Sequence, residues 1–357
     1  MSVTPATKAM KNILSLLVLG AVVTVAQAQV NPGVNQSDTT RAQRATENAL
    51  PAMQPGDALP ALYDGESEDV GPQSVLRVKK TPWLRVGLDV QSFYTDNMLY
   101  TEHDEEDAGV AITSVEGALM TKPCITRFAS YRGELGYRHQ FYNYFGNDKV
   151  LEQSSSVGRP VHYAAEDFDF DSSTFFANLT AQTRHYQFGL GLDYTRLFGF
   201  KDLRKNNYDE FYSDASPRWS VQRNFRVCNR SQLSFAYLGS YHFTDEDGPL
   251  VDLPPGTSVK IRDDRSERWE HTFLAAYTVA LPCSLAAQPY YRFQFNDFEH
   301  TDNYMIHTAG FSLGWYPCEN FSVRGFVGYN WSDAKNSLVA EYEKLDAGGG
   351  VTATWRF

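Results

Sequence analysis

The sequence predicts an all-β fold: a transmembrane antiparallel β-barrel of about 12 strands, preceded by a disordered N-terminal periplasmic extension. Three observations predict it. The chain begins with a secretory signal, it then alternates apolar and polar residues in segments of ten or more, and the links between these segments are alternately short and long. The expected organisation is a signal peptide over 1–28, a flexible periplasmic extension over 29–80 and an outer-membrane barrel over 81–357.

The signal places the protein beyond the inner membrane. Lys8 and Lys11 precede an apolar run from Ile13 to Ala26, and Ala26-Gln27-Ala28 fits a small-x-small cleavage site. That run is too short for a membrane helix, and no later stretch reaches about 18 apolar residues, so a helical membrane protein is excluded. Mean hydropathy is below zero although 14% of the residues are aromatic. Strands with one face in lipid and the other in water give this combination.

The segment from Gln29 to about Lys80 is rich in amide, hydroxyl, Pro and acidic residues and has no sustained period of 2 or 3.6. This composition is typical of a disordered linker. A short helix over Arg41–Leu50, and a role as a plug or partner-binding tail, remain open alternatives.

From Trp83 onward the period is 2. In His185–Phe198, for example, five apolar residues alternate with Gln187, Gly189, Gly191 and Asp193. The apolar set, expected to face lipid together with Tyr291 and Val327, is Tyr186, Phe188, Leu190, Leu192 and Tyr194. Gln187 and Gln294 are expected to face the lumen.

A globular β-sandwich would show the same alternation, and the links decide between the two. Short links lie near Pro123, Thr183, Asn229, Pro282 and Pro317, and long polar ones near 101–109, 146–168, 201–214, 244–266, 297–303 and 332–346. Short periplasmic turns with long external loops are typical of outer-membrane barrels, and both ends of the barrel are then periplasmic.

The chain ends in VTATWRF, which resembles the last strand of bacterial outer-membrane β-barrel proteins. In that superfamily the terminal aromatic is read by the barrel-assembly machinery, so the resemblance implies that Trp355 and Phe357 are an assembly signal. It also implies a porin-like protein of about twelve strands, similar to the putative β-barrel porins, in the outer membrane of a Gram-negative cell. The implied partners are outer-membrane lipid and lipopolysaccharide, the assembly machinery and small solutes, with no nucleic acid.

Charge is unevenly divided between loops and strands. The six long links hold 26 acidic and 10 basic residues, whereas the strands and turns hold 10 acidic and 15 basic ones. Two interpretations stay open: Arg–carboxylate pairs bridge a narrow lumen, or excess positive charge lines a water-filled path and sets its selectivity. The residues expected to line the lumen are Arg85, Asp89, Arg132, Glu134, Arg138, Asp193, Arg226, Arg292, Arg324 and Arg356.

The four cysteines, Cys124, Cys228, Cys283 and Cys318, fall at expected periplasmic turns. The periplasm permits disulfides. Turns two strands apart start roughly 10 Å apart, however, whereas a disulfide needs Cα atoms within about 7 Å. One disulfide, joining Cys283 to Cys318 or Cys228, and four free, half-buried thiols both stay open. No metal site is expected, because ligands spread around a rim do not converge.

The expected function is that of a porin or passive solute channel that favours small anionic solutes, with no enzymatic activity and no cofactor. One alternative is a non-conducting structural or surface-interaction barrel with acidic extracellular loops. Another is an outer-membrane enzyme that resembles the phospholipases, which place Ser, His and Asn on the lipid face. His139 and His271 are expected near that face, but the strand register predicts no Ser–His or carboxylate–His pair in contact.

Overall fold

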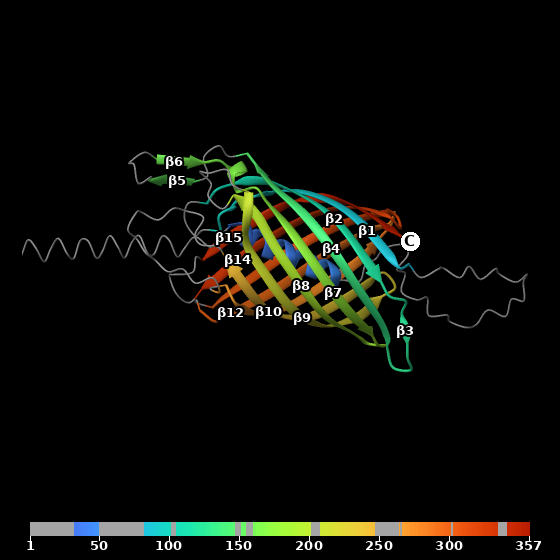
Figure 1. Ribbon diagram of the computed structural model, residues 1–357. Helices are drawn as coiled ribbons and strands as arrows, with labels where there is room; N and C mark the ends of the chain where they lie inside the picture. Colours follow the sequence, from blue (N-terminus) through green and yellow to red (C-terminus); the bar gives the residue numbers. More distant parts are fainter. Residues whose placement is uncertain are drawn as a thin grey trace, which may run out of the picture.

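The computed structural model describes residues 32–49, 82–100, 105–146, 151–154, 160–200, 208–246, 264, 266–300, 303–334 and 341–357. Twelve long strands form the wall of a barrel (Figure 1). They are β1 (Leu84–Thr95), β2 (Ala108–Met120), β4 (Ser130–Phe145), β7 (Phe170–Gln182), β8 (Tyr186–Phe200), β9 (Tyr208–Cys228), β10 (Ser231–Glu246), β11 (Arg268–Leu281), β12 (Leu285–Phe298), β13 (Tyr304–Cys318), β14 (Phe321–Ala334) and β15 (Tyr342–Arg356).

The sheet closes on itself. Each of these strands pairs antiparallel with its neighbour in the chain, and β15 pairs back onto β1 with Leu88 opposite Ala353. The last residue completes the seam, because the Phe357 N–H donates to Leu84 O at 2.9 Å and Trp83 N–H donates to Phe357 O at 2.8 Å. A closed ladder leaves no unpaired strand edge in lipid. The predicted closed, antiparallel β-barrel of twelve strands is therefore confirmed.

The two rims differ as the link lengths predicted. At the rim that holds the C-terminus the hairpins are tight, such as the two residues Glu319–Asn320 between β13 and β14. The short strand β3 (Cys124–Ile125) extends β4 beyond this rim (Figure 1). The opposite rim carries the long links, including the hairpin β5 (Leu151–Ser154) and β6 (Pro160–Tyr163) and the 3-10 turn η1 (Ala165–Phe168). By this asymmetry we call the first rim periplasmic and the second extracellular.

The side chains alternate between the two faces of the wall. Outward positions are apolar and exposed, as at Leu190 (62% exposed) and Val327 (40%), whereas the inward Gln294 is buried. The expected lipid-facing register is thus the observed one.

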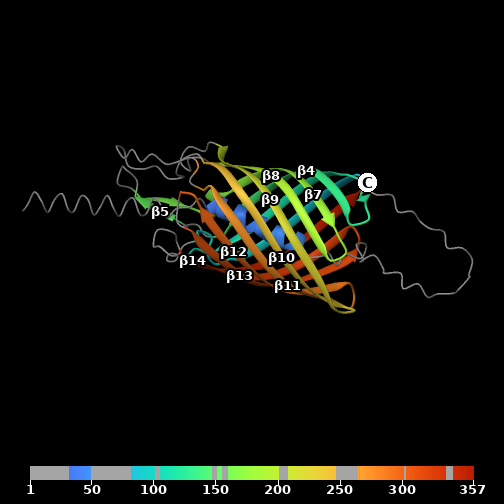
Figure 2. The same cartoon turned by 90° about the horizontal axis from the view of Figure 1, so that it is seen from below.

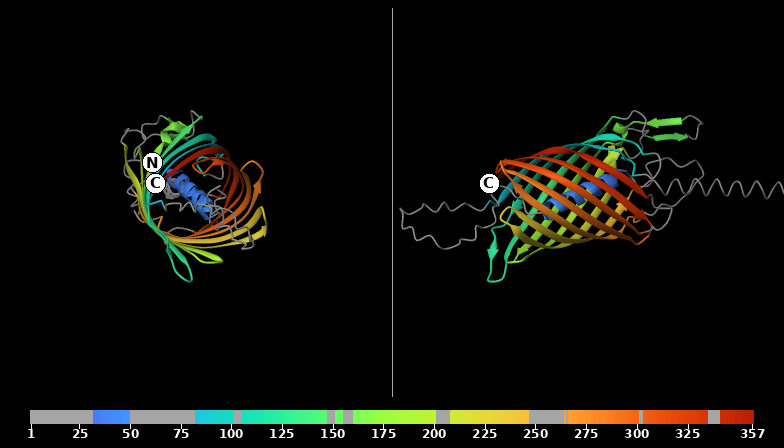
Figure 3. Two further views of the ribbon diagram at one scale, coloured as in Figure 1. Left: turned by 90° about the vertical axis from the view of Figure 1, so that its right-hand side faces the viewer. Right: turned by 180° about the vertical axis from the view of Figure 1, so that it is seen from behind.

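A helix lies inside the barrel. Seen along the barrel axis, α2 (Pro32–Ala49) is enclosed by the strands (Figure 3, left), and views from two other sides agree (Figures 1 and 2). The sequence predicted a disordered linker here, with a short helix over Arg41–Leu50 as an alternative. The structure instead has a helix that begins nine residues before Arg41. It lacks a sustained apolar stripe, and for that reason the pattern did not predict it. The remainder of 29–80 and the signal peptide lie outside the described residues.

The helix runs from the extracellular rim toward the periplasm. Val34, near its start, packs among Met98 and Leu197, which lie at the extracellular ends of the wall, whereas Arg44 contacts Ser114 in the middle of β2. Within the described residues, no helix combines the length and the apolar content needed to cross a bilayer. The polar α2 is instead shielded from lipid by the wall.

The register makes the first testable prediction. Leu190→Arg should lower the free energy of unfolding by roughly 2–4 kcal/mol, because a guanidinium at this depth loses its water, whereas the lumen-facing Gln187→Arg should cost little. Denaturant titration of the refolded barrel in lipid vesicles measures both. Equal losses at the two positions would place the register one residue out, because a one-residue slip exchanges the faces.

Candidate functional site

The extracellular half of the lumen is packed like a core on one side. Val34 of α2 joins buried apolar residues that six neighbouring strands and their loops contribute, among them Phe93, Ile112, Tyr142 and Phe211. Burying a valine side chain stabilises by about 1.5–3 kcal/mol. This contact fixes the first turn of the helix against the wall.

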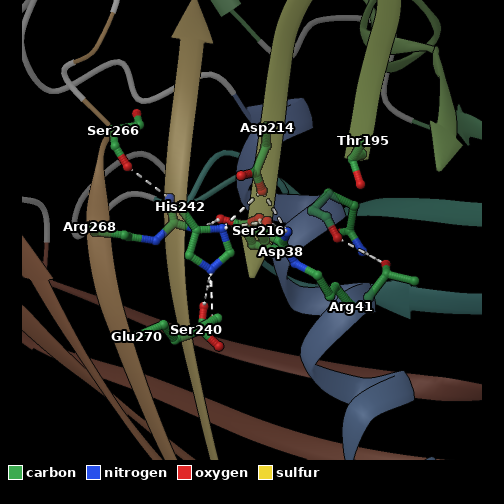
Figure 4. Close-up of polar contacts among 12 residues, drawn as sticks. Asp38, Arg41, Thr195, Asp214, Ser216, Ser240, His242, Ser266, Arg268 and Glu270 are labelled. Atoms are coloured by element: carbon green, nitrogen blue, oxygen red, sulfur yellow. Dashed lines mark hydrogen bonds and ion pairs between the residues drawn. The ribbon is translucent and has the colours of Figure 1, made fainter. Parts of the chain in front are cut away.

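Ion pairs hold the next turn of α2 to β9 and β11. Arg41 Nη1 donates to Asp214 Oδ2 at 2.7 Å, and Asp38 accepts from the Arg268 guanidinium (Figure 4). The Asp214 and Arg268 side chains are 0% and 3% exposed. We call the whole cluster the latch; its members are Asp38, Arg41, Asp214, His242, Arg268 and Glu270.

His242 lies at the centre of the latch. Its Nδ1 is 2.9 Å from Asp214 Oδ2, and its Nε2 is 3.5 Å from Glu270 Oε2 and 2.9 Å from Ser240 Oγ (Figure 4). Because each ring nitrogen faces a carboxylate, an imidazolium that donates from both fits this geometry. The latch holds three carboxylates and two guanidiniums, so a proton on His242 also makes it neutral overall.

A second polar contact closes the lumen above the latch. The Lys344 ammonium is fully buried and donates to Tyr100 Oη at 2.7 Å and to Gln36 Oε1 of the helix at 3.2 Å. Burial raises the pKa of the Tyr100 phenol, so its hydroxyl stays protonated and donates to Gln36 Oε1 at 2.9 Å. Tyr100 has a φ of 56°, a left-handed conformation that is strained for a residue with a bulky side chain.

Arg44 ties the helix to the middle of the barrel. Its Nη2 donates to Ser114 Oγ at 2.6 Å and lies 3.7 Å from Asp89 Oδ2. Arg324 from β14 lies 3.3 Å from the same carboxylate oxygen. Asp89 of β1 therefore lies close to two arginines, Arg44 of the helix and Arg324 of the wall.

The helix divides the free space in the lumen unequally. Between α2 and the wall formed by β12 to β15, at the extracellular side, the cavity measures about 50 Å³. Below the latch a cavity of about 500 Å³ extends toward the periplasmic rim, where Arg85 and Arg356 line it. We call this larger cavity the vestibule. Seven arginines and five carboxylates line it: Arg41, Arg44, Arg85, Arg138, Arg218, Arg324 and Arg356, with Asp89, Glu116, Glu134, Asp193 and Glu270.

Most of the charged residues expected to line the lumen do point inward, and most of them form ion pairs with residues of opposite charge. Arg85 and Arg138 both bind Glu116, at 2.5 and 2.6 Å, and Arg85 also binds Glu134. Asp193 accepts from Arg218 at 3.0 Å. Arg292 is buried and donates to Thr308 Oγ1, and Arg132 Nη2 lies 2.9 Å from the Met120 sulfur. Arg226 is exposed near the periplasmic end of β9, where it donates to Asn229 in the turn, and it does not line the large cavity.

The four cysteines lie at the periplasmic rim, where they were expected, but they are free and exposed rather than half-buried. Neither disulfide considered from the sequence is formed, because the thiols belong to separate hairpins. Cys283 and Ser284, with φ of 62° and 60°, are the two central residues of one such turn, and two successive left-handed residues give the tight type I′ hairpin.

The expectation that no Ser–His pair is in contact on the lipid face was wrong. His139 Nδ1 lies 2.8 Å from Ser173 Oγ, and its Nε2 lies 3.9 Å from Asp171. The contact was missed because it joins opposite residues of β4 and β7 and is not a local sequence motif. Tyr137 Oη also contacts both partners, and Tyr–His contacts recur at Tyr237–His271 and Tyr291–His307. This recurrence favours a structural role in an aromatic belt.

The latch itself was not found from the sequence. Asp214 was assigned to the expected loop 201–214, whereas β9 is 21 residues long and already begins at Tyr208. The usable signal was the alternation of Asp214, Ser216, Arg218, Ser220 and Gln222, all of which face inward on β9.

The comparisons with known proteins go no further than the architecture. No protein-family model matches the chain, and no curated protein sequence matches it. Among solved structures, an outer-membrane channel from Pseudomonas putida F1 is similar with 8% identity and a TM-score of 0.49, covering 80% of this chain and all of that one. The β domain of the Bordetella autotransporter Brka has 10% identity, a TM-score of 0.45 and coverage of 77% and 100%. The translocator domain of the autotransporter NalP from Neisseria meningitidis has 12% identity and a TM-score of 0.39, and the match covers 90% of this chain and 99% of that one.

The latch makes the second prediction. In a double-mutant cycle, Arg41→Gln and Asp214→Asn should be strongly coupled, and Asp214→Asn alone should cost about 3–5 kcal/mol of unfolding free energy, because it leaves buried charges without their partner. The matched control is the exposed pair Arg196–Glu210 near the extracellular rim, where the coupling should be within about 0–1 kcal/mol. Equal coupling for the two pairs would mean that α2 is not held by the latch.

Proposed function

We propose that the protein is a gated outer-membrane channel that α2 holds closed. The observation that supports it is the latch: helix and wall meet through complementary charges inside the lumen, and the cavity between the helix and strands β12 to β15 measures about 50 Å³. A passive porin that is open at rest fits this geometry less well, because a solute would have to pass the space that the helix fills.

The chemistry of the interface supports a gate. Val34 and Ala42 are the buried apolar side chains among those described for the helix; its other described contacts with the wall use amide, hydroxyl, carboxylate and guanidinium groups, including Gln36, Asp38, Arg41 and Arg44. Such groups can exchange a partner on the wall for water when the lumen fills with water, since a hydrogen bond contributes about 0.5–1.5 kcal/mol net and one to a charged group about 1.5–3 kcal/mol. An apolar interface would have to expose its whole area to water when it separated. The helix can therefore separate from the wall without exposing a large apolar surface to water in the lumen.

A second candidate is the non-conducting structural barrel. The pairing of Arg85, Arg138 and Arg218 with carboxylates favours it, because paired charges rigidify an interior. Conductance separates the two candidates, since only a gate opens when the latch is weakened.

The vestibule supports a preference for small anions. Its seven arginines exceed its five carboxylates, and its low-dielectric wall strengthens the field of the excess. Planar guanidiniums bind carboxylates through two parallel hydrogen bonds, so acidic oligosaccharides and other small carboxylates are the proposed cargo.

The third prediction tests the gate. Asp38→Asn with Asp214→Asn removes the acidic partners of both latch arginines and leaves Arg41 and Arg268 to repel one another. In planar bilayers the wild-type protein should stay in its closed state and pass little current. The variant should show steady openings, because its closed state has lost these ion pairs.

The control neutralises two carboxylates outside the lumen, Asp171→Asn with Glu210→Gln, and should behave as the wild type. A variant as silent as the wild type would favour the permanently closed barrel. A wild-type channel that is open as often as the latch variant would refute gating by α2.

The fourth prediction concerns selectivity and uses the latch variant, whose two substitutions lie outside the vestibule. The reversal potential of this latch variant under a salt gradient should indicate that the open channel prefers anions. Adding Arg138→Gln, Arg218→Gln and Arg324→Gln leaves four arginines against five carboxylates, so the reversal potential should shift toward cations.

The control makes the same change of three charges on the periplasmic turns, with Lys122→Gln, Arg127→Gln and Arg184→Gln, and should shift the potential little because exposed charges are screened by salt. If the latch variant with an unchanged vestibule preferred cations, the acidic loops rather than the vestibule would govern selectivity.

A further inference from the structure

The outer face of the wall carries an apolar hollow of about 370 Å³ across β9 to β12. Its floor is Ala275, whose cross-strand neighbours are the aromatic Phe235 on β10 and Tyr291 on β12. Phe273, Phe293 and Val221 complete the sides. The hollow exists because one short side chain stands in a row of large ones.

A cation lies at one end of the hollow. Arg223 of β9, which lines it, is cross-strand to Phe235 and to Tyr186. Its guanidinium lies 4.4 Å above the Phe225 ring and 5.0 Å above the Tyr186 ring, and its Nη1 donates to Tyr186 Oη at 2.9 Å. Stacking between two rings holds the group in place. A guanidinium has five N–H donors, so donors remain for a phosphate.

The depth of Arg223 identifies the membrane leaflet. Its neighbour Tyr186 is the first residue of β8 after the short turn, so Arg223 lies at the level of the periplasmic interface. The periplasmic leaflet of an outer membrane consists of phospholipid, and lipopolysaccharide occupies the other leaflet. From Arg223 the hollow continues past Phe235 to Ala275 and Tyr291, away from the periplasmic rim.

We propose that this hollow is a specific site for one phospholipid of the periplasmic leaflet. Arg223 binds the phosphodiester, and one acyl chain fills the space above Ala275 between the rings of Phe235 and Tyr291. The site is independent of the gate, since Arg223, Phe235, Ala275 and Tyr291 belong to the outer face of the wall.

The fifth prediction tests this site on the full-length barrel, purified in a mild detergent with its native lipids and examined by native mass spectrometry. The wild type should retain a phospholipid that Ala275→Phe displaces, because the ring fills the hollow. Arg223→Gln should reduce retention about tenfold, the equivalent of one charge-assisted hydrogen bond. Ala275→Leu, a smaller change, provides a second variant should Ala275→Phe not fold.

The matched controls lie on the same outer face but away from the hollow. They are Arg196→Gln, whose guanidinium stacks on Phe198 toward the extracellular rim, and Ala177→Phe on β7. Both should retain phospholipid as the wild type does. Equal retention by Arg223→Gln and the wild type, or lipopolysaccharide as the retained molecule, would overturn the proposal, whatever the conductance of the protein.

Discussion

The structure depends on the match between the charges of one helix and those of the wall around it. Asp214 and Arg268 are buried on β9 and β11, and each finds its partner on α2. A buried charge without a partner costs several kcal/mol, so these two wall residues would destabilise a barrel from which the helix was missing unless water replaced it. Conversely, an isolated 18-residue helix as polar as α2 is marginal in water. Helix and wall thus stabilise one another.

This mutual dependence explains why the lumen has two different halves. On the extracellular side, where Val34 packs and Lys344 joins Tyr100 to Gln36, the side chains of helix and wall fill the space. On the periplasmic side several wall residues have no side chain, namely Gly87, Gly189 and Gly191, which line the vestibule. The long arginine side chains therefore have space to extend into the lumen. Arg44 belongs to both halves, since it is part of the helix and contacts Asp89 beside Arg324. A small anion that bound these arginines would act directly on a contact that holds the helix.

The wall could be predicted from the sequence because its physics is local. Lipid on one side and water on the other impose a period of 2, which placed Leu190 outward and Gln187 inward, and the link lengths set the orientation of the rims. The helix could not be predicted in the same way. Its partners lie as far away in the chain as Asp214, Arg268 and Lys344, and a helix that packs on polar walls needs no apolar stripe. The contact between His139 and Ser173 was missed for a related reason, since it depends on which residues of two strands stand opposite one another.

Hydrogen–deuterium exchange of the backbone amides of α2, with the protein in lipid bilayers, tests the central claim most directly. Because such a helix is marginal in water, only its seat in the lumen can protect it. The amides of residues 36–44 should therefore exchange as slowly as those of the neighbouring strands, and Asp38→Asn with Asp214→Asn should speed their exchange while leaving the strands protected. Exchange of these amides in the wild type at the rate of an unstructured chain would contradict the account.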